Sequence, residues 1–177
     1  MAFPSAFSGL RDARGILLAN EDETAAFGGH LARLVRPGSV WSFRGPLGVG
    51  KTALVRCILR ALAGDAVERN EAVPSPSFTL VQEYSRGGLR VLHVDMWRLG
   101  AGDSLEVLGL EEAHDDGAAI FAEWLRGDFP MGLDLTLTMS FSDAANGDGD
   151  SDGDSDAAAD DARRVRLEGR ALDALSE

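Results

Sequence analysis

The stretch GPLGVGKT, residues 45–52, decides the fold of this chain. It fits G-x-x-x-x-G-K-[ST], a loop whose backbone N–H groups wrap phosphate oxygens. Residues 39–44 (SVWSFR) before it have the composition of a strand, and apolar side chains recur at helical spacing from about Lys51 to Leu62. Strand, loop and helix in this order are the context that the pattern requires. The sequence therefore predicts a nucleotide-phosphate site.

Lys51 is the only lysine in the chain, and the other 16 basic residues are arginines. A compact ammonium fits between the β- and γ-phosphate oxygens inside such a loop, whereas a planar guanidinium is too wide for it. Thr52 next to it supplies a hydroxyl for Mg²⁺. We therefore expect chemistry, rather than composition, to keep this position a lysine.

The pattern outside the loop predicts an α/β fold, a single P-loop NTPase domain with a mostly parallel central sheet flanked by helices. Asn20 is a candidate N-cap for the first helix, with an acidic first turn behind it. The last two strands alternate in polarity and are expected to form an antiparallel C-terminal pair. The expected strands are 16–19, 39–44, 77–84, 90–95, 118–124, 133–141 and 163–168, and a helix is also expected over 103–114.

The domain organisation is predicted from composition. Residues 1–15 are expected to be a poorly ordered N-terminal extension, and residues 16–177 to be the P-loop NTPase domain. Residues 143–162 hold eight aspartates and no basic residue, which is typical of a disordered, low-complexity insertion in a loop. A partial calcium-loop pattern begins at Asp148, but its twelfth position is Ala159 instead of glutamate, so we do not expect a calcium site.

Composition also limits the classes of function. One cysteine, Cys57, allows no internal disulfide, and neither a long apolar run nor a secretory signal is visible. These features predict a cytoplasmic protein that does not bind membranes. The net charge of −12 argues against a broad DNA- or RNA-binding surface. Taking the eight aspartates of the insertion from the 29 acidic residues leaves 21 against 17 basic ones, so contact between RNA and a local arginine patch stays open.

Two carboxylates are candidates for the metal side of the site. Asp95 ends the apolar strand 90–95, and Glu123 ends the apolar run 118–124. Either one could reach Mg²⁺, and Glu123 could instead orient water. His93 has the pattern of a packed strand residue, and we expect no catalysis by it.

Residues 74–79 (PSPSFT) lie between the loop helix and the Asp95 strand. P-loop switches place there a hydroxyl that senses the γ-phosphate and the metal. A stretch of prolines and serines is in itself most often just a loop.

Taken together, these motifs resemble the TsaE (YjeE) family, the bacterial ATPases of tRNA threonylcarbamoyladenosine biosynthesis. The resemblance runs from about Ile16 to Gly169 outside the insertion. Three positions depart from the family pattern, namely Pro46, Trp97 and Leu125, and none of them removes a phosphate or metal ligand. The matching residues are Thr24 and Gly28, the loop 45–52, SPSFTLVQEY at 75–84, VLHVDMWRL at 91–99, Glu123-Trp124 and the closing strand 163–167.

The resemblance implies a Mg²⁺-dependent ATPase that is weak alone and works with the transferase TsaD and its paralogue TsaB. Its cycle would support modification of adenosine 37 in tRNAs that read ANN codons, with tRNA met through the complex. The expected site residues are, for nucleotide binding, Thr24, Gly45, Leu47, Gly48, Val49, Gly50, Lys51, Thr52, Ala53 and Trp124; for metal binding, Thr52, Asp95 and Glu123; for catalysis, Lys51, Asp95 and Glu123; and for the switch, Ser77 and Thr79.

Two other functions fit the loop. A small-molecule or nucleoside kinase has the same loop and size, but it usually needs an arginine-rich lid, and no such segment stands out. A nucleotide-dependent binding module with incidental hydrolysis would be no true enzyme. A GTPase is disfavoured, because the N-K-x-D motif needs a second lysine.

Overall fold

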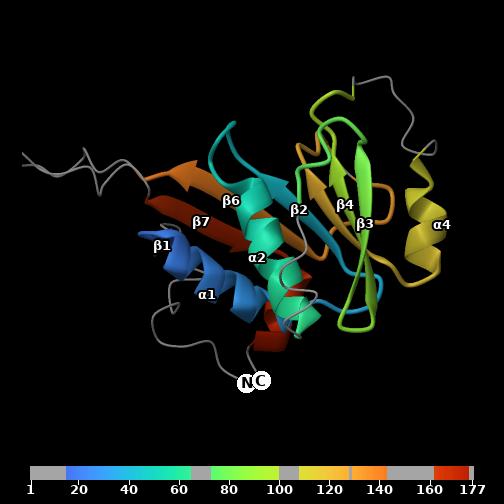
Figure 1. Ribbon diagram of the computed structural model, residues 1–177, viewed down its shortest axis with the longest axis horizontal. Coiled ribbons are helices and arrows are strands. Elements are labelled where there is room, and N and C mark those ends of the chain that lie inside the picture. The colour runs from blue at the N-terminus through green and yellow to red at the C-terminus, as the bar shows by residue number, and fades with distance from the viewer. Residues whose placement is uncertain (1–14, 65–72, 100–107, 128, 143–161, 176–177) are drawn as a thin grey trace, which may run out of the picture.

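The computed structural model describes residues 15–64, 73–99, 108–127, 129–142 and 162–175. They form a seven-stranded sheet in the order β1-β7-β6-β2-β5-β4-β3 (Figure 1). The four strands β6, β2, β5 and β4 run parallel, while β7, β1 and β3 pair antiparallel at the two edges. The predicted α/β class, the mostly parallel centre and the antiparallel C-terminal pair are confirmed. The strands are β1 (Ile16–Leu18), β2 (Val40–Arg44), β3 (Val81–Arg86), β4 (Leu89–Asp95), β5 (Ala119–Glu123), β6 (Leu135–Phe141) and β7 (Arg163–Glu168).

Two helices cover one face of this sheet. Helices α1 (Glu21–Ala32) and α2 (Lys51–Ala63) lie side by side against it (Figure 1), and the larger apolar core lies between them and the sheet. The Asn20 side chain caps α1 by accepting a bond from the Glu23 N–H, and the Glu23 carboxylate accepts one from the Ala19 N–H. Asn20 is the cap that the sequence predicted, and the two bonds together fix where α1 begins.

A second, smaller core lies on the opposite face. Helix α4 (Leu110–Asp115) packs there on β5, with Leu110 and Ala113 buried. The side chains of β2 alternate between the two faces, so Trp41 and Phe43 join the larger core while Val40 joins the smaller one. The sheet is therefore covered on both faces around β2, the strand that leads into the phosphate loop.

The predicted strand over 77–84 is wrong in its first half. Pro76 to Leu80 form a turn, in which the Leu80 N–H donates to the Pro76 carbonyl oxygen at 2.7 Å and Leu80 has a φ of 64°. A left-handed residue breaks the extended backbone, and prolines at 74 and 76 cannot donate to a sheet ladder. Strand β3 therefore begins only at Val81.

Two further boundaries differ from the sequence prediction. Within the expected helix over 103–114, the described part is α4, which starts at Leu110 after Gly109 with a φ of 64°; residues 100–107 lie outside the described residues. The described residues also end in a short 3₁₀ helix, η4 (Arg170–Leu175), which the sequence did not predict.

The predicted extension over 1–15 and the predicted insertion over 143–162 lie outside the described residues, apart from Gly15 and Ala162. The strands on either side of the second segment pair directly, because Phe141 is in register with Arg163 and the Ser142 N–H donates to the Ala162 carbonyl oxygen at 3.1 Å. Among the described residues, no helix is both long and apolar enough to cross a bilayer.

Candidate functional site

The carboxyl ends of the parallel strands meet at one edge of the sheet. Strand β2 ends at Arg44 and runs into the loop, β5 ends at Glu123, and β4 ends at Asp95. The register pairs Asp95 with Glu123 across β4 and β5. This edge is where open α/β sheets bind ligands, and helix α2 begins there with its N-terminus toward the same space.

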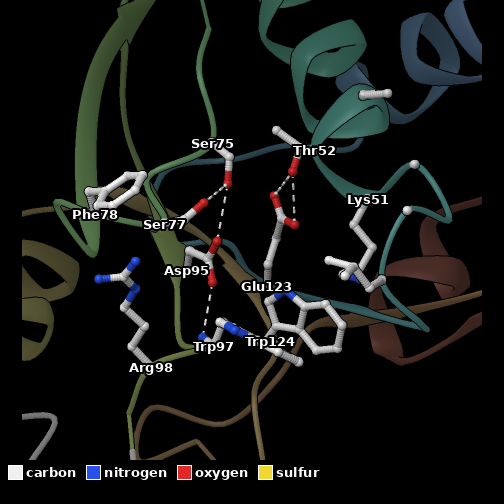
Figure 2. A pocket seen from close by; sticks show the side chains of 14 residues that line it. Lys51, Thr52, Ser75, Ser77, Phe78, Asp95, Trp97, Arg98, Glu123 and Trp124 are labelled. Atoms are coloured by element: carbon white, nitrogen blue, oxygen red, sulfur yellow. Dashed lines mark hydrogen bonds between the residues drawn. The ribbon is translucent and has the colours of Figure 1, made fainter.

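A pocket of about 460 Å³ opens at this edge (Figure 2). It lies between the phosphate loop, the segment before β3 and the ends of β4 and β5. Its lining residues are Leu47, Gly48, Gly50, Lys51, Thr52, Ala53, Ser75, Ser77, Phe78, Asp95, Trp97, Arg98, Glu123 and Trp124.

The Lys51 ammonium is held inside the loop. Its Nζ donates to the Gly45 carbonyl oxygen at 2.9 Å and to the Pro46 carbonyl oxygen at 2.8 Å, and it lies 3.6 Å from the centre of the Trp124 ring. The side chain is 4% exposed, and this burial lowers the pKa of the ammonium, against the raising effect of Glu123 and Asp95. The site thus holds a desolvated cation, which interacts strongly with any anion that enters.

Thr52 and Glu123 connect the start of α2 to the end of β5. The Thr52 hydroxyl lies 2.8 Å from Glu123 Oε1 and 3.0 Å from Oε2. Glu123 is 2% exposed, and its Oε1 also lies 2.7 Å from Nε2 of the fully buried His93. Buried carboxylates need such partners, and these bonds hold the Glu123 side chain toward the pocket.

Asp95 is tied to the segment before β3. Its Oδ2 accepts a bond from the Ser75 hydroxyl at 3.1 Å, and the hydroxyls of Ser75 and Ser77 are 2.8 Å apart (Figure 2). Its Oδ1 accepts a bond from the Trp97 N–H at 2.9 Å. Asp95 is therefore bonded to Ser75 and, through Ser75, connected to Ser77.

Aromatic side chains form the rim of the pocket. Trp97 and Trp124 contact each other with ring centroids 4.4 Å apart, and Trp124 adopts a left-handed backbone with a φ of 61°. Arg98 lies over the Phe78 ring at 4.5 Å, and Phe78 is 83% exposed. The Phe78 ring therefore extends from the rim of the polar pocket into solvent.

Most of the residues predicted from the sequence come together in this pocket, and four do not line it. Thr24 is half-buried in α1, where its hydroxyl donates to the Asn20 carbonyl oxygen at 3.0 Å. Val49 is fully buried in the larger core, and a side chain on Gly45 would meet the Met139 carbonyl oxygen. Val49 and Gly45 therefore support the loop on the side that faces away from the pocket. Thr79 lies in the turn before β3 and does not line the pocket.

Sequence reasoning did not assign five residues of this neighbourhood, namely Ser75, Phe78, Trp97, Arg98 and His93. Four of them line the pocket, and His93 contacts Glu123 from the buried side, without lining the pocket itself. All five lie inside the stretches 75–84 and 91–99 that carried the family resemblance, which is the signal that could have found them.

The residues present fit Mg²⁺. Magnesium prefers hard oxygen ligands, and a P-loop needs only a loop hydroxyl and a carboxylate besides phosphate and water oxygens. Thr52, Glu123 and Asp95 supply this set at one edge of the sheet. In the described part of the chain, no group of three or more His, Cys, Asp and Glu side chains forms a separate metal site.

Comparisons with known proteins support the fold and indicate the family. A crystal structure of Bacillus subtilis YdiB superposes with a TM-score of 0.55 over 85% of this chain and 80% of that chain, and at 23% identity it supports the fold. Three proteins named tRNA threonylcarbamoyladenosine biosynthesis protein TsaE are similar in sequence. The Rickettsia felis protein is 34% identical over 62% of this chain and 61% of its own length. The Aquifex aeolicus protein is 32% identical over 68% of this chain and 83% of its own length. The Bacillus subtilis protein is 33% identical over 59% of this chain and 62% of its own length.

A family model provides the assignment. The model described as threonylcarbamoyl adenosine biosynthesis protein TsaE matches residues 18–146, which include the loop, both carboxylates and the segment before β3. The predicted resemblance is confirmed, and this chain belongs to the TsaE family of tRNA threonylcarbamoyladenosine biosynthesis proteins.

Proposed function

We propose that this chain is a Mg²⁺-dependent ATPase that supports formation of threonylcarbamoyladenosine at position 37 of tRNAs reading ANN codons. It acts in the cytoplasm with a TsaD-like transferase and a TsaB-like paralogue, and it meets tRNA through that complex. One observation carries the proposal: a P-loop lysine, a loop hydroxyl and two strand-end carboxylates line a single pocket.

Each residue has a distinct task in hydrolysis. Lys51 exchanges its bonds to the loop carbonyls for bonds to phosphate oxygens and stabilises the charge that develops on the leaving phosphates. The loop N–H groups and the N-terminus of α2 bind the remaining phosphate oxygens. Because Lys51 is buried, its charge acts through little water and contributes more than a surface charge would.

The two carboxylates divide the metal side of the pocket. Thr52 and Glu123, with Asp95 on the same side of the pocket, would hold Mg²⁺, and the ion would supply charge neutralisation at the phosphates. Asp95 accepts hydrogen bonds from water on the same side. Its bond to Ser75 supports a switch, because that serine contacts Ser77, which directly precedes the exposed Phe78.

Purified full-length protein tests the proposal by its release of phosphate from ATP. We expect slow, Mg²⁺-dependent hydrolysis that changes when TsaD-like and TsaB-like proteins are added. Nucleosides and other small acceptors serve as the comparison, because a kinase would transfer the γ-phosphate to one of them. Transfer to an acceptor, with no effect of the partner proteins, would replace the ATPase by the kinase function.

The role in tRNA modification has its own test in the source organism. Nuclease digests of bulk tRNA, analysed by mass spectrometry, measure threonylcarbamoyladenosine directly. We expect depletion of this nucleoside after loss of the gene and its return on complementation. Restoration by a Lys51→Ala chain would show that ATP use at this loop is not what the modification requires.

A further inference from the structure

We propose that His93 is the positioning residue for Glu123: it selects which carboxylate oxygen faces the metal side of the pocket. This inference rests on the proposed function, in which Glu123 holds Mg²⁺. His93 itself contacts neither the pocket nor a bound phosphate, since it does not line the pocket and is fully buried behind Glu123.

The sheet register places the two side chains in contact. Strands β4 and β5 are parallel, with His93 opposite Phe121, so Glu123 lies two residues farther along on the same face. Side chains at such diagonal positions come within reach of each other when one of them is long. Nε2 of His93 and Oε1 of Glu123 are 2.7 Å apart, and the two side chains are 0% and 2% exposed.

The direction of this hydrogen bond follows from the atoms involved. A metal-binding Glu123 is a carboxylate, whose oxygens only accept, so the proposed role places the His93 proton on Nε2, from which it is donated to Oε1. Nδ1 is buried and has no hydrogen-bond partner within the described residues. Among the described residues, no group at Nδ1 therefore competes with Glu123 for the ring, and the packing around the fully buried ring holds Nε2 toward Oε1.

Thr52 alone does not fix the carboxylate. Its hydroxyl has one proton and lies at nearly equal distances, 2.8 and 3.0 Å, from the two oxygens of Glu123, so this contact does not distinguish them. His93 contacts Oε1 only. The pair of contacts thus anchors Oε1 and leaves Oε2 with the open lone pairs. Hydrogen-bond partners of this kind set ligand orientation, and their loss typically costs about 10- to 100-fold in metal affinity or activity.

Two amide substitutions test whether a hydrogen-bond donor is needed at the position of Nε2 or whether any polar side chain at residue 93 is enough. In His93→Gln the amide nitrogen reaches the place of Nε2, whereas in His93→Asn it stops near the place of Nδ1 and cannot reach Glu123. His93→Leu removes the donor without leaving a buried polar group, and it replaces His93→Asn if that chain fails to fold. His114→Asn is the matched control, since His114 bonds the Gly38 carbonyl oxygen at the start of β2, at the other end of that strand from the loop.

The measurement is the affinity for Mn²⁺, as a probe of the Mg²⁺ site, in the presence of a non-hydrolysable ATP analogue, followed by titration calorimetry. We expect His93→Asn and His93→Leu to weaken Mn²⁺ binding about tenfold, and His93→Gln to stay within about threefold of the unchanged chain. Binding of the analogue without metal should stay the same in all variants. In steady state, the Mg²⁺ concentration for half-maximal ATP turnover should shift by the same factors.

Each outcome bears on the inference separately from the proposed function. Unchanged Mn²⁺ affinity in His93→Asn or His93→Leu overturns it, and so does an equal loss in His93→Gln, which would indicate a packing role. If the unchanged chain binds the metal and the analogue but does not hydrolyse ATP, the ATPase function fails while the positioning role is still decided by the affinities. If the unchanged chain binds no metal with the analogue, both fail together.

Discussion

The Lys51 ammonium lies 3.6 Å from the centre of the Trp124 ring and is bonded to two loop carbonyl oxygens. Lys51 starts α2, and Trp124 follows β5 with a left-handed backbone. The ring therefore covers the cation from the side opposite the loop. Two predictions depend directly on this enclosure of a single positive charge.

Lys51→Arg should abolish function while keeping the charge. A guanidinium is a planar fork and cannot occupy the space between the two loop carbonyls and the Trp124 ring without opening the loop. We expect ATP turnover to fall by about 100-fold or more, the size of effect seen when one donor to a developing anion is lost. Arg90→Lys is the control. Arg90 on β4 is exposed and pairs with Glu83 on β3, so we expect replacement by lysine to leave turnover unchanged. Turnover of Lys51→Arg within a few-fold of normal would refute the steric argument.

Lys51→Met should change how stability depends on pH. Burial lowers the pKa of Lys51 below its ordinary 10.5, so between these two pKa values the unfolded chain binds more protons than the folded one. Raising the pH through this alkaline window therefore stabilises the folded state, and this contribution is absent below it. Urea unfolding without nucleotide, from pH 7 to 10.5, should show the extra rise in the unchanged chain and not in Lys51→Met. An equal pH dependence of the two chains, or a fall of stability through this window in the unchanged chain relative to Lys51→Met, would contradict the sign.

Thr52→Ser and Thr52→Val separate the hydroxyl from the shape of the side chain. Serine keeps the group that contacts both oxygens of Glu123, and valine keeps the branched shape without it. We expect Thr52→Ser to retain Mg²⁺-dependent turnover within about tenfold, and Thr52→Val to lose about 100-fold or more. Phosphate release measured over a range of Mg²⁺ concentrations is the readout. Equal activity of the two variants would remove Thr52 from the metal side of the site.

Gly28→Ala and Gly29→Ala form a matched pair in α1. A methyl group on Gly28 would lie 2.5 Å from Cβ of Cys57 in α2, whereas one on Gly29 would meet nothing within 4 Å. We expect Gly28→Ala to lower the free energy of unfolding by about 1–3 kcal/mol through overpacking. Gly29→Ala should raise it by about 0.5–1 kcal/mol, because alanine is the better helix former. Denaturant unfolding checks both, and stabilisation by Gly28→Ala would show that α1 and α2 pack less closely.

Shortening the connection between β6 and β7 should be tolerated. These strands pair up to Phe141 and Arg163, so four linker residues in place of 143–161 span the same gap. A shorter connection costs less closure entropy, by about 1 kcal/mol for this change in length, and removes eight aspartates. Melting temperature and ATP turnover should stay the same or rise. A drop of more than a few degrees would show that the segment contributes to the fold.

The sequence predicted those parts of the site that adjacent residues encode. The loop needs a strand before it and a helix after it, and the cap at Asn20 involves Ala19 and Glu23, so the relevant residues are near neighbours in the chain. The turn before β3 was mispredicted. Leu80 is an apolar residue in a strand-like stretch, but its backbone is left-handed and belongs to a turn. The Leu80 carbonyl oxygen accepts a hydrogen bond from the Asp95 N–H, 15 positions later in the chain. No local pattern signals such a long-range contact.

His93 illustrates the same limit within the site. Its sequence context, an apolar strand, predicts a packed residue, and it is indeed fully buried. Only the register of β4 on β5 brings it to Glu123, which is 30 positions later in the chain. The bond between Ser75 and Asp95 depends in the same way on where the turn before β3 lies.

By itself, the sequence determined that this chain has a phosphate loop between a strand and a helix, that Asp95 and Glu123 end their strands, and that the fold is a largely parallel α/β sheet. The backbone conformation and the side-chain chemistry of these features depend on neighbouring residues. Only the tertiary structure decided that Lys51 lies against Trp124, that Glu123 is shared by Thr52 and His93, and that Ser75 bonds Asp95. Those contacts join residues far apart in the chain, and they exist because strand order and register place the ends of β4 and β5 beside the start of α2.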